Sequence, residues 1–176
     1  MASNHAANQP QALTSETQDV VKAFESLDTD PKLAVFYYIY EKMGDSITPA
    51  APAATEPELA PRLLGDYYNL PKDEQLAIMR QIVNCEDTDY SRAYGALKEN
   101  NQLMVWYAWA QAMGDSVVGM PQNYERTQAL NDVLSQIEAL SFDDQISILR
   151  TIAGDMGCSD VKPIETQAQS GKTSSL

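Results

Sequence analysis

Apolar positions along this chain recur with the spacing of α-helices, and almost nowhere do they alternate with polar positions as in a β-strand. Leu33, Phe36, Tyr37 and Tyr40 lie at i, i+3, i+4 and i+7, so they share one helical face. The pattern predicts helices over residues 20–27, 31–43, 57–69, 71–84, 88–98, 100–113, 123–139 and 141–156. We therefore expect an all-α fold.

Two stretches of the chain repeat one pattern 70 residues apart. LAVFYYIYEKMGDS begins at Leu33 and LMVWYAWAQAMGDS at Leu103, and DEQLAIMRQI from Asp73 aligns with DDQISILRTI from Asp143. The offset holds without a gap over most of the chain, which indicates a duplicated helical unit, and two copies are too few for a solenoid. We predict two interlocked four-helix bundles related by a pseudo-twofold axis, with the two aromatic helices facing each other across a seam.

The composition of the two ends differs from that of the middle. Residues 1–17 are polar, and residues 161–176 lack periodic apolar positions, so we expect a disordered leader and a disordered tail. Residues 18–160 form the expected helical domain, with a proline-rich connection, ITPAAPAATEPE, from Ile47.

Charge and the lack of targeting signals narrow the class of protein. The chain has 12 Lys and Arg against 25 Asp and Glu, a formal net charge of -13, which disfavours nucleic acid and anionic membranes as partners. There is no signal-peptide pattern and no apolar run long enough to span a membrane, so we expect a cytoplasmic protein. Cys85 and Cys158 are too few for a disulfide framework and are interpreted as reduced, packed thiols.

Catalytic residues are scarce in the sequence. The single histidine, His5, lies in the leader, which leaves the helical domain without a histidine base or metal ligand. The carboxylate pairs Asp73–Glu74 and Asp143–Asp144 each lie in the first turn of a helix, where negative charge is favoured by the helix dipole. We predict neither an enzyme nor a metal site.

The aromatic helices carry the strongest chemical signal. The second one repeats the face of the first with Leu103, Trp106, Tyr107 and Ala110. The chain has 9 Tyr but only 3 Phe, and buried tyrosine needs a hydrogen-bond partner, so a ring-lined tunnel for a long apolar ligand explains these residues better than a dry core. Further walls are predicted at Met79, Ile82, Met113, Met120 and Ile146. The alternative is that all of these residues are ordinary core.

The order of these motifs resembles one known family. The run from Leu33 to Pro52, LMVWY from Leu103, Met120-Pro121 followed by Tyr124, and QISILR from Gln145 are similar to the all-helical N-terminal domain of the cyanobacterial orange carotenoid protein, and to stand-alone helical carotenoid proteins. The resemblance covers roughly residues 19–160. It implies a bound ketocarotenoid, such as canthaxanthin, echinenone or hydroxyechinenone. The implied contacts are Leu33, Phe36, Tyr37, Tyr40, Met79, Ile82, Leu103, Trp106, Tyr107, Ala110, Met113, Met120, Tyr124 and Ile146.

The resemblance also implies partners and leaves three functions open. Arg150 matches the family's interdomain arginine, so it could reach a phycobilisome at the thylakoid surface or a separate homologue of the family's C-terminal domain. A nearby carboxylate on this chain is the alternative partner of Arg150. The first function is photoprotection by quenching singlet oxygen and excited states. The second is a constitutive phycobilisome quencher or a carotenoid carrier, and the third is a helical interaction module without a ligand. We expect a monomer.

Overall fold

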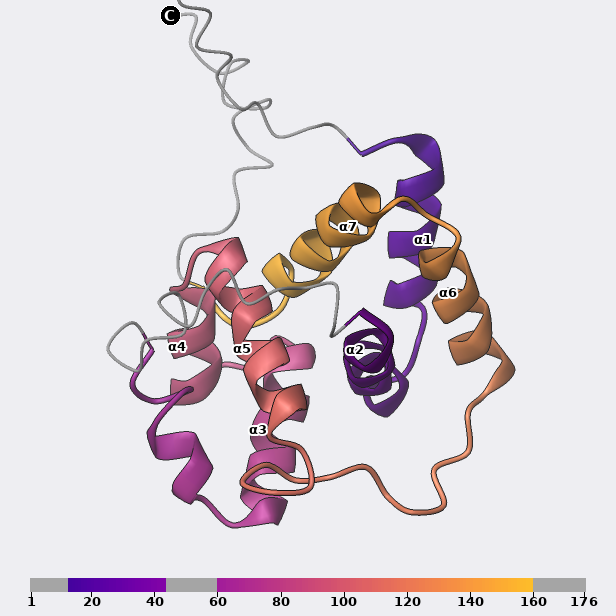
Figure 1. Cartoon of the computed structure of the whole chain (residues 1–176). Helices are drawn as coiled ribbons and strands as arrows, with labels where there is room; N and C mark the ends of the chain where they lie inside the picture. Colours follow the sequence, from indigo (N-terminus) through magenta and orange to yellow (C-terminus); the bar gives the residue numbers. More distant parts are fainter. Residues whose placement is uncertain (1–12, 44–59, 160–176) are drawn as a thin grey trace, which may run out of the picture.

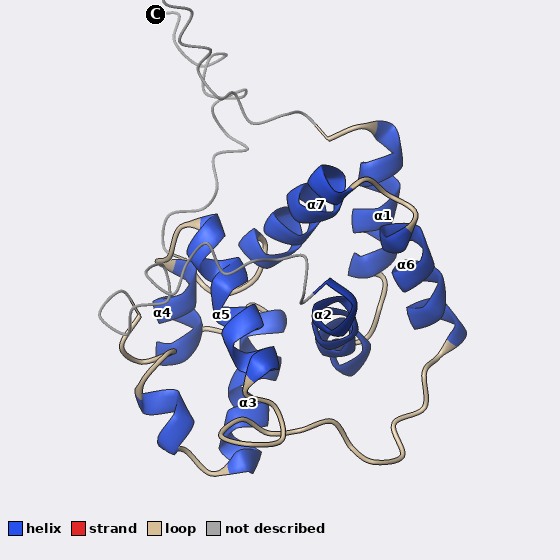
Figure 2. Ribbon diagram, in the orientation of Figure 1, coloured by secondary structure: helices blue, strands red, loops and turns tan. Residues whose placement is uncertain are grey.

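The computed structural model describes residues 13–43 and 60–159. These residues form α1 (Ser15–Glu25), α2 (Thr29–Met43), the 3-10 helix η1 (Asp66–Asn69), α3 (Lys72–Val83), α4 (Asp89–Gly95), α5 (Glu99–Gln111), α6 (Gln128–Glu138) and α7 (Phe142–Gly154). Figure 2 shows no strand in this part of the chain, and the only extended pairing there is an isolated bridge between Met113 and Val117. The prediction of an all-α fold is confirmed.

Helix boundaries follow local capping groups. Ser141 caps α7 as its spacing to Asp144 predicts, since the Ser141 hydroxyl accepts a hydrogen bond from the Asp144 backbone N–H at 3.2 Å. The Thr14 side chain caps α1 in the same way, and Thr17 is only 2% exposed. Helical order therefore begins at Ser15, three residues inside the segment 1–17 that was expected to be disordered.

The helices predicted over 57–69 and 123–139 differ most from the structure. In the segment predicted as a helix over 57–69, the described residues form turns from residue 60 and then only η1. The Leu63 carbonyl there accepts a hydrogen bond from the Trp109 indole, and the Asp66 N–H reaches back to the Pro61 carbonyl, so the helical ladder is broken. The helix predicted from residue 123 begins at Gln128 because Thr127 caps it. Gly44 and the proline-rich connection lie outside the described residues.

The first helix of each half packs on the other half. Figure 1 shows α2 between a group formed by α1, α6 and α7 and a group that contains α3, α4 and α5. α1 packs on α6 and α7, while α4 packs on α3, and α2 contacts α3, α5 and α6. The most extensive contact joins α5 to α7. The two halves of the chain are thus interleaved, so neither half can bury its apolar faces alone.

Equivalent side chains in the two halves make equivalent contacts. The Gln75 amide donates to the Tyr67 carbonyl at 3.1 Å, and Gln145 donates to the Ile137 carbonyl at 2.9 Å. Phe24 meets Phe36 edge to face at 6.2 Å, and the residues 70 positions later, Tyr94 and Trp106, do so at 6.1 Å. The contacts therefore follow the 70-residue offset read from the sequence. The division into two interlocked four-helix bundles stays a prediction.

Candidate functional site

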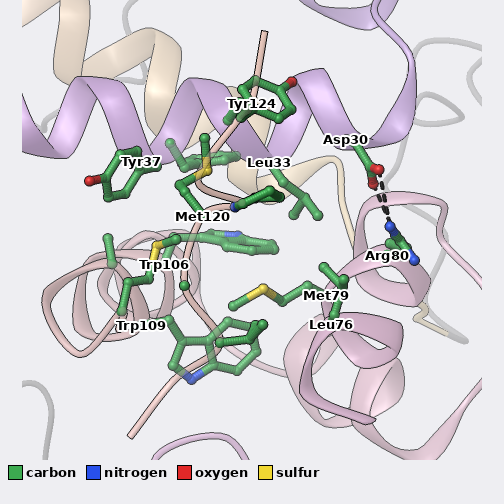
Figure 3. Close-up of a pocket in the computed structure, with 17 residues that line it drawn as sticks. Asp30, Leu33, Tyr37, Leu76, Met79, Arg80, Trp106, Trp109, Met120 and Tyr124 are labelled. Atoms are coloured by element: carbon green, nitrogen blue, oxygen red, sulfur yellow. Dashed lines mark hydrogen bonds and ion pairs between the residues drawn. The ribbon is translucent and has the colours of Figure 1, made fainter. Parts of the chain in front are cut away.

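A cavity of about 250 Å³ lies between α2, α3 and α5 and is closed on one side by the loop after α5. Figure 3 shows Trp106, Trp109 and Met79 on one side of it, with Tyr37, Leu33, Tyr124 and Met120 on the other. Nine predicted contact residues line it: Leu33, Phe36, Tyr37, Met79, Trp106, Ala110, Met113, Met120 and Tyr124. Its walls are therefore mainly aromatic faces and methionine side chains, which suit an apolar ligand.

Both tryptophans have their indole N–H groups bonded to protein oxygens. Trp109 donates to the Leu63 carbonyl at 2.9 Å and stacks on Tyr67 at 4.1 Å. Trp106 donates to the Tyr94 hydroxyl at 2.9 Å, and that hydroxyl donates to the Ala153 carbonyl at 2.5 Å. With these polar atoms satisfied, the rings can contribute apolar area to the cavity at no cost in lost hydrogen bonds.

The loop wall of the cavity is held by one buried side chain. Gln75 is 0% exposed, and its amide N–H groups donate to the carbonyls of Tyr67 and Ser116. Its side-chain oxygen accepts from the Val118 N–H at 2.8 Å. The loop follows the end of α5 at Gln111, and Gly114 of the Met-Gly-Asp-Ser motif takes a positive φ of 82° within it. These bonds place Val118, Gly119 and Met120 against the cavity.

A charged pair lies at the edge of this otherwise apolar site. Arg80 donates to Asp30 through two nitrogens, at 2.9 and 3.0 Å, and both residues line the cavity. The dashed lines in Figure 3 mark this bidentate pair beside Leu76 and Met79. The pair joins the first turn of α2 to α3, so the edge of the cavity carries a paired charge and not an isolated one.

The two aromatic helices meet directly at the centre of the seam. Phe36 and Trp106, which are 70 residues apart, stack with ring centroids 5.0 Å apart and planes 12° apart. Tyr40 and Tyr107 lie 5.9 Å apart with a tilt of 44°. The cavity therefore occupies one side of the seam, and aromatic contacts fill its centre.

Five predicted contact residues lie outside the cavity lining: Tyr40, Ile82, Leu103, Tyr107 and Ile146. Adding 70 to Leu33 and Tyr37 gives Leu103 and Tyr107, so these two belong to the pseudo-equivalent side of the seam. Burial raises the pKa of the Tyr107 hydroxyl, while the positive charge of Arg150 acts in the opposite direction.

Sequence reasoning missed eight lining residues: Asp30, Ala34, Leu76, Arg80, Trp109, Val118, Gly119 and Pro121. The 70-residue repeat could have predicted two of these lining residues. Subtracting 70 from Ile146 and Arg150, both of which were singled out, gives Leu76 and Arg80. The loop residues had no such signal, because their position depends on the bonds made by Gln75.

The same offset shows how the two ends of the seam differ in charge. Arg80 has Asp30 as its partner, whereas Arg150 has Asn100 at the equivalent position, 70 residues beyond Asp30. Arg150 is exposed, and the structure records no ion pair or hydrogen bond for it within the described residues. The carboxylate partner considered for Arg150 in the sequence is therefore absent from the part of the chain that the structure describes.

Comparison with known proteins places the chain in a family. Residues 10–159 match the family model described as "Orange carotenoid protein, N-terminal". The chain belongs to the orange carotenoid protein N-terminal family. A relative named orange carotenoid-binding domain-containing protein, from Nostoc sp., is 38% identical over 152 residues, which cover 84% of this chain and 89% of that protein. The orange carotenoid-binding protein of Synechocystis sp. is 32% identical over 144 residues and is matched over only 45% of its length.

Solved structures of the same family share the fold. The red carotenoid protein of Anabaena (Nostoc) sp. binding canthaxanthin superposes with a TM-score of 0.71 at 29% identity, over 81% of this chain and 99% of that one. The orange carotenoid protein of the same organism, also binding canthaxanthin, gives a TM-score of 0.76 at 28% identity, over 85% of this chain and 48% of that one. The family resemblance read from the motifs is thereby confirmed.

Other site types find no support in the described residues. None of the helices there is long and apolar enough to cross a membrane. No group of three potential metal ligands occurs within that same part of the chain.

Proposed function

We propose that this chain is a carotenoid-binding photoprotective protein that holds a ketocarotenoid along the seam between the two halves. The observation that carries the proposal is the cavity walled by Phe36, Trp106 and Trp109, in a chain of the orange carotenoid protein N-terminal family. Two structural relatives are described as binding canthaxanthin, which supports this class of ligand.

The size of the cavity limits what it can hold by itself. At about 250 Å³ it falls below the 300–1,000 Å³ typical of sites for drug-sized ligands, so it suits one end ring of a carotenoid and the start of its polyene. The rest of the ligand would follow the seam past the Phe36–Trp106 stack, with Tyr40 and Tyr107 moving apart. In this proposal, the predicted contact residues outside the cavity meet that part of the ligand.

The protein's role in this proposal is to solubilise, shape and screen the pigment. When bound, a long conjugated polyene supplies low-lying excited states that accept energy from singlet oxygen and release it as heat. Ring faces along α2 and α5 bury its apolar surface, which contributes roughly 25 cal/mol per Å². Because the ligand binds only the folded chain, it also stabilises the fold.

The test is colour. The full chain is expressed in bacteria that make canthaxanthin and purified, and the expected result is an orange or red protein with absorption shifted from that of the free pigment. Ala110→Trp fills the cavity, since Ala110 lines it and is 9% exposed, and should yield folded, colourless protein. Ala77→Trp, on the exposed face of α3, is the matched control and should keep the colour. A colourless wild type would favour the ligand-free interaction module instead.

Docking to a phycobilisome or to a carrier related to the family's C-terminal domain is a second proposal. It is supported by the exposed side chain of Arg150, for which Asn100 occupies the position that Asp30 occupies for Arg80 in the other half of the chain. Asn100→Asp supplies the missing carboxylate, so it should weaken docking as Arg150→Ala does, because the cation gains a partner on its own chain. Arg92→Gln, which removes an arginine already paired with Asp87, is the control in co-sedimentation with phycobilisomes. Equal docking by all variants would contradict the proposal.

A further inference from the structure

Tyr107 carries a buried hydroxyl without a hydrogen-bond partner among the described residues. The residue is 7% exposed, so water has little access to it. Nearly all buried tyrosine hydroxyls in proteins are hydrogen-bonded, because an unmet donor loses its bond to water and gains nothing in return. A buried hydroxyl without an acceptor, located in a binding seam, therefore indicates that the ligand supplies the acceptor.

The Tyr107 side chain lies outside the cavity lining and packs against the other aromatic helix. The Tyr107 ring, on α5, packs against Tyr40 of α2, and the charge of Arg150 on α7 reaches it. α5 contacts both α2 and α7, so the phenol lies where three helices meet. An end ring that passed the Phe36–Trp106 stack from the cavity side would arrive here.

Comparison with the pseudo-equivalent tyrosine shows that the buried, unpaired hydroxyl occurs at only one of the two described ends of the seam. Tyr37 corresponds to Tyr107, and its hydroxyl donates to Glu41 at 2.8 Å on the protein surface. Position 111, which corresponds to Glu41, holds Gln111, and the Tyr107 hydroxyl does not bond to it. Within the part of the chain that the structure describes, a tyrosine hydroxyl is thus hydrogen-bonded at one end of the seam and has no partner at the other.

We infer that the Tyr107 hydroxyl donates a hydrogen bond to an oxygen on the terminal ring of the bound carotenoid, so that this end of the seam selects an oxygenated ring over a hydrocarbon ring. The inference rests on the proposed function. A ring carbonyl accepts the bond, whereas a hydrocarbon ring would leave the hydroxyl buried and unpaired. A single neutral bond of this kind corresponds to a preference of about 3-fold to 10-fold.

The experiment offers the full-length apoprotein an equimolar mixture of canthaxanthin and β-carotene in detergent micelles. The pigment bound by wild type, Tyr107→Phe and Tyr67→Phe is extracted and its ratio measured. Tyr67→Phe is the matched control, because Tyr67 is 0% exposed, donates to the Gln75 carbonyl and does not line the cavity. We expect wild type and Tyr67→Phe to prefer canthaxanthin, and Tyr107→Phe to lose about 3-fold to 10-fold of that preference.

Two further readouts separate a bond to the ligand from a structural role. The C=O stretching band of bound canthaxanthin should lie at lower frequency in wild type than in Tyr107→Phe. Without pigment, Tyr107→Phe should melt no lower than wild type, since it removes an unpaired group, whereas Tyr67→Phe should melt lower. An unchanged pigment ratio or an unchanged C=O band in Tyr107→Phe would overturn the inference while leaving the proposed function intact. A wild type that takes up no carotenoid would overturn both.

Discussion

Replacing Gln75 with alanine should destabilise the protein far more than the same change at Gln145. Gln75 makes three side-chain hydrogen bonds, of 3.1, 2.9 and 2.8 Å, and is 0% exposed. At about 1 kcal/mol for each bond, the loss is about 3 kcal/mol. Gln145 is half-buried and makes one bond of 2.9 Å and a second, weak one of 3.5 Å, so its removal should cost about 1 kcal/mol.

Urea titration and thermal melting, each followed by circular dichroism at 222 nm, measure both losses. For a chain of this size, 1 kcal/mol shifts the melting temperature by roughly 2–4 °C, so Gln75→Ala should melt roughly 6–12 °C lower and Gln145→Ala roughly 2–4 °C lower. Gln75→Ala should also bind pigment less well, because the loop that carries Val118 and Met120 loses its anchor. Equal destabilisation by the two variants would refute the reasoning, since it would show that the loop contacts add nothing.

Three other outcomes are expected. Tyr107→Phe should raise the free energy of unfolding of the apoprotein by about 1 kcal/mol, and a loss of stability in urea titrations would contradict this. Burial raises the pKa of Tyr67, Tyr94 and Tyr107, so the folded chain keeps protons that the unfolded chain releases above about pH 10. This contribution to stability is complete below the unfolded pKa and falls as the pH rises past it. The urea midpoint should therefore be level up to about pH 9 and drop above about pH 10. A midpoint that stayed level to about pH 11.5 would refute this prediction. Trp106→Ala combined with Tyr40→Ala should lower pigment affinity strongly, and unchanged affinity measured by pigment titration would exclude these rings as walls.

The periodic apolar positions were enough to predict the helices and much of the site. A helical face depends on residues three and four positions apart, so Leu33, Phe36 and Tyr37 could be assigned to one wall from their spacing alone. All three line the cavity. The helix predicted over 57–69 is wrong because a hydrogen bond from Trp109 to the Leu63 carbonyl interrupts it, and Trp109 lies 46 positions beyond Leu63, outside any local pattern.

The 70-residue repeat was also detectable in the sequence, and it predicted contacts between distant residues better than single motifs did. It relates Phe36 to Trp106, which stack on one another, and Gln75 to Gln145, which make matching bonds. Applied throughout, it would have added Leu76 and Arg80 to the predicted walls. Self-similarity carries long-range information because equivalent residues meet equivalent neighbours when the halves pack together.

By itself the sequence determined the all-α class, the family and the aromatic faces of α2 and α5, because these depend on local spacing and residue type. Only the tertiary structure decided which parts of those faces enclose space and which touch each other. It placed the loop around Gly119 and Met120 through the buried amide of Gln75. It also left the Tyr107 hydroxyl without a hydrogen-bond partner among the described residues. Such outcomes depend on which groups from distant segments reach one another, and a pattern along the chain does not encode those distances.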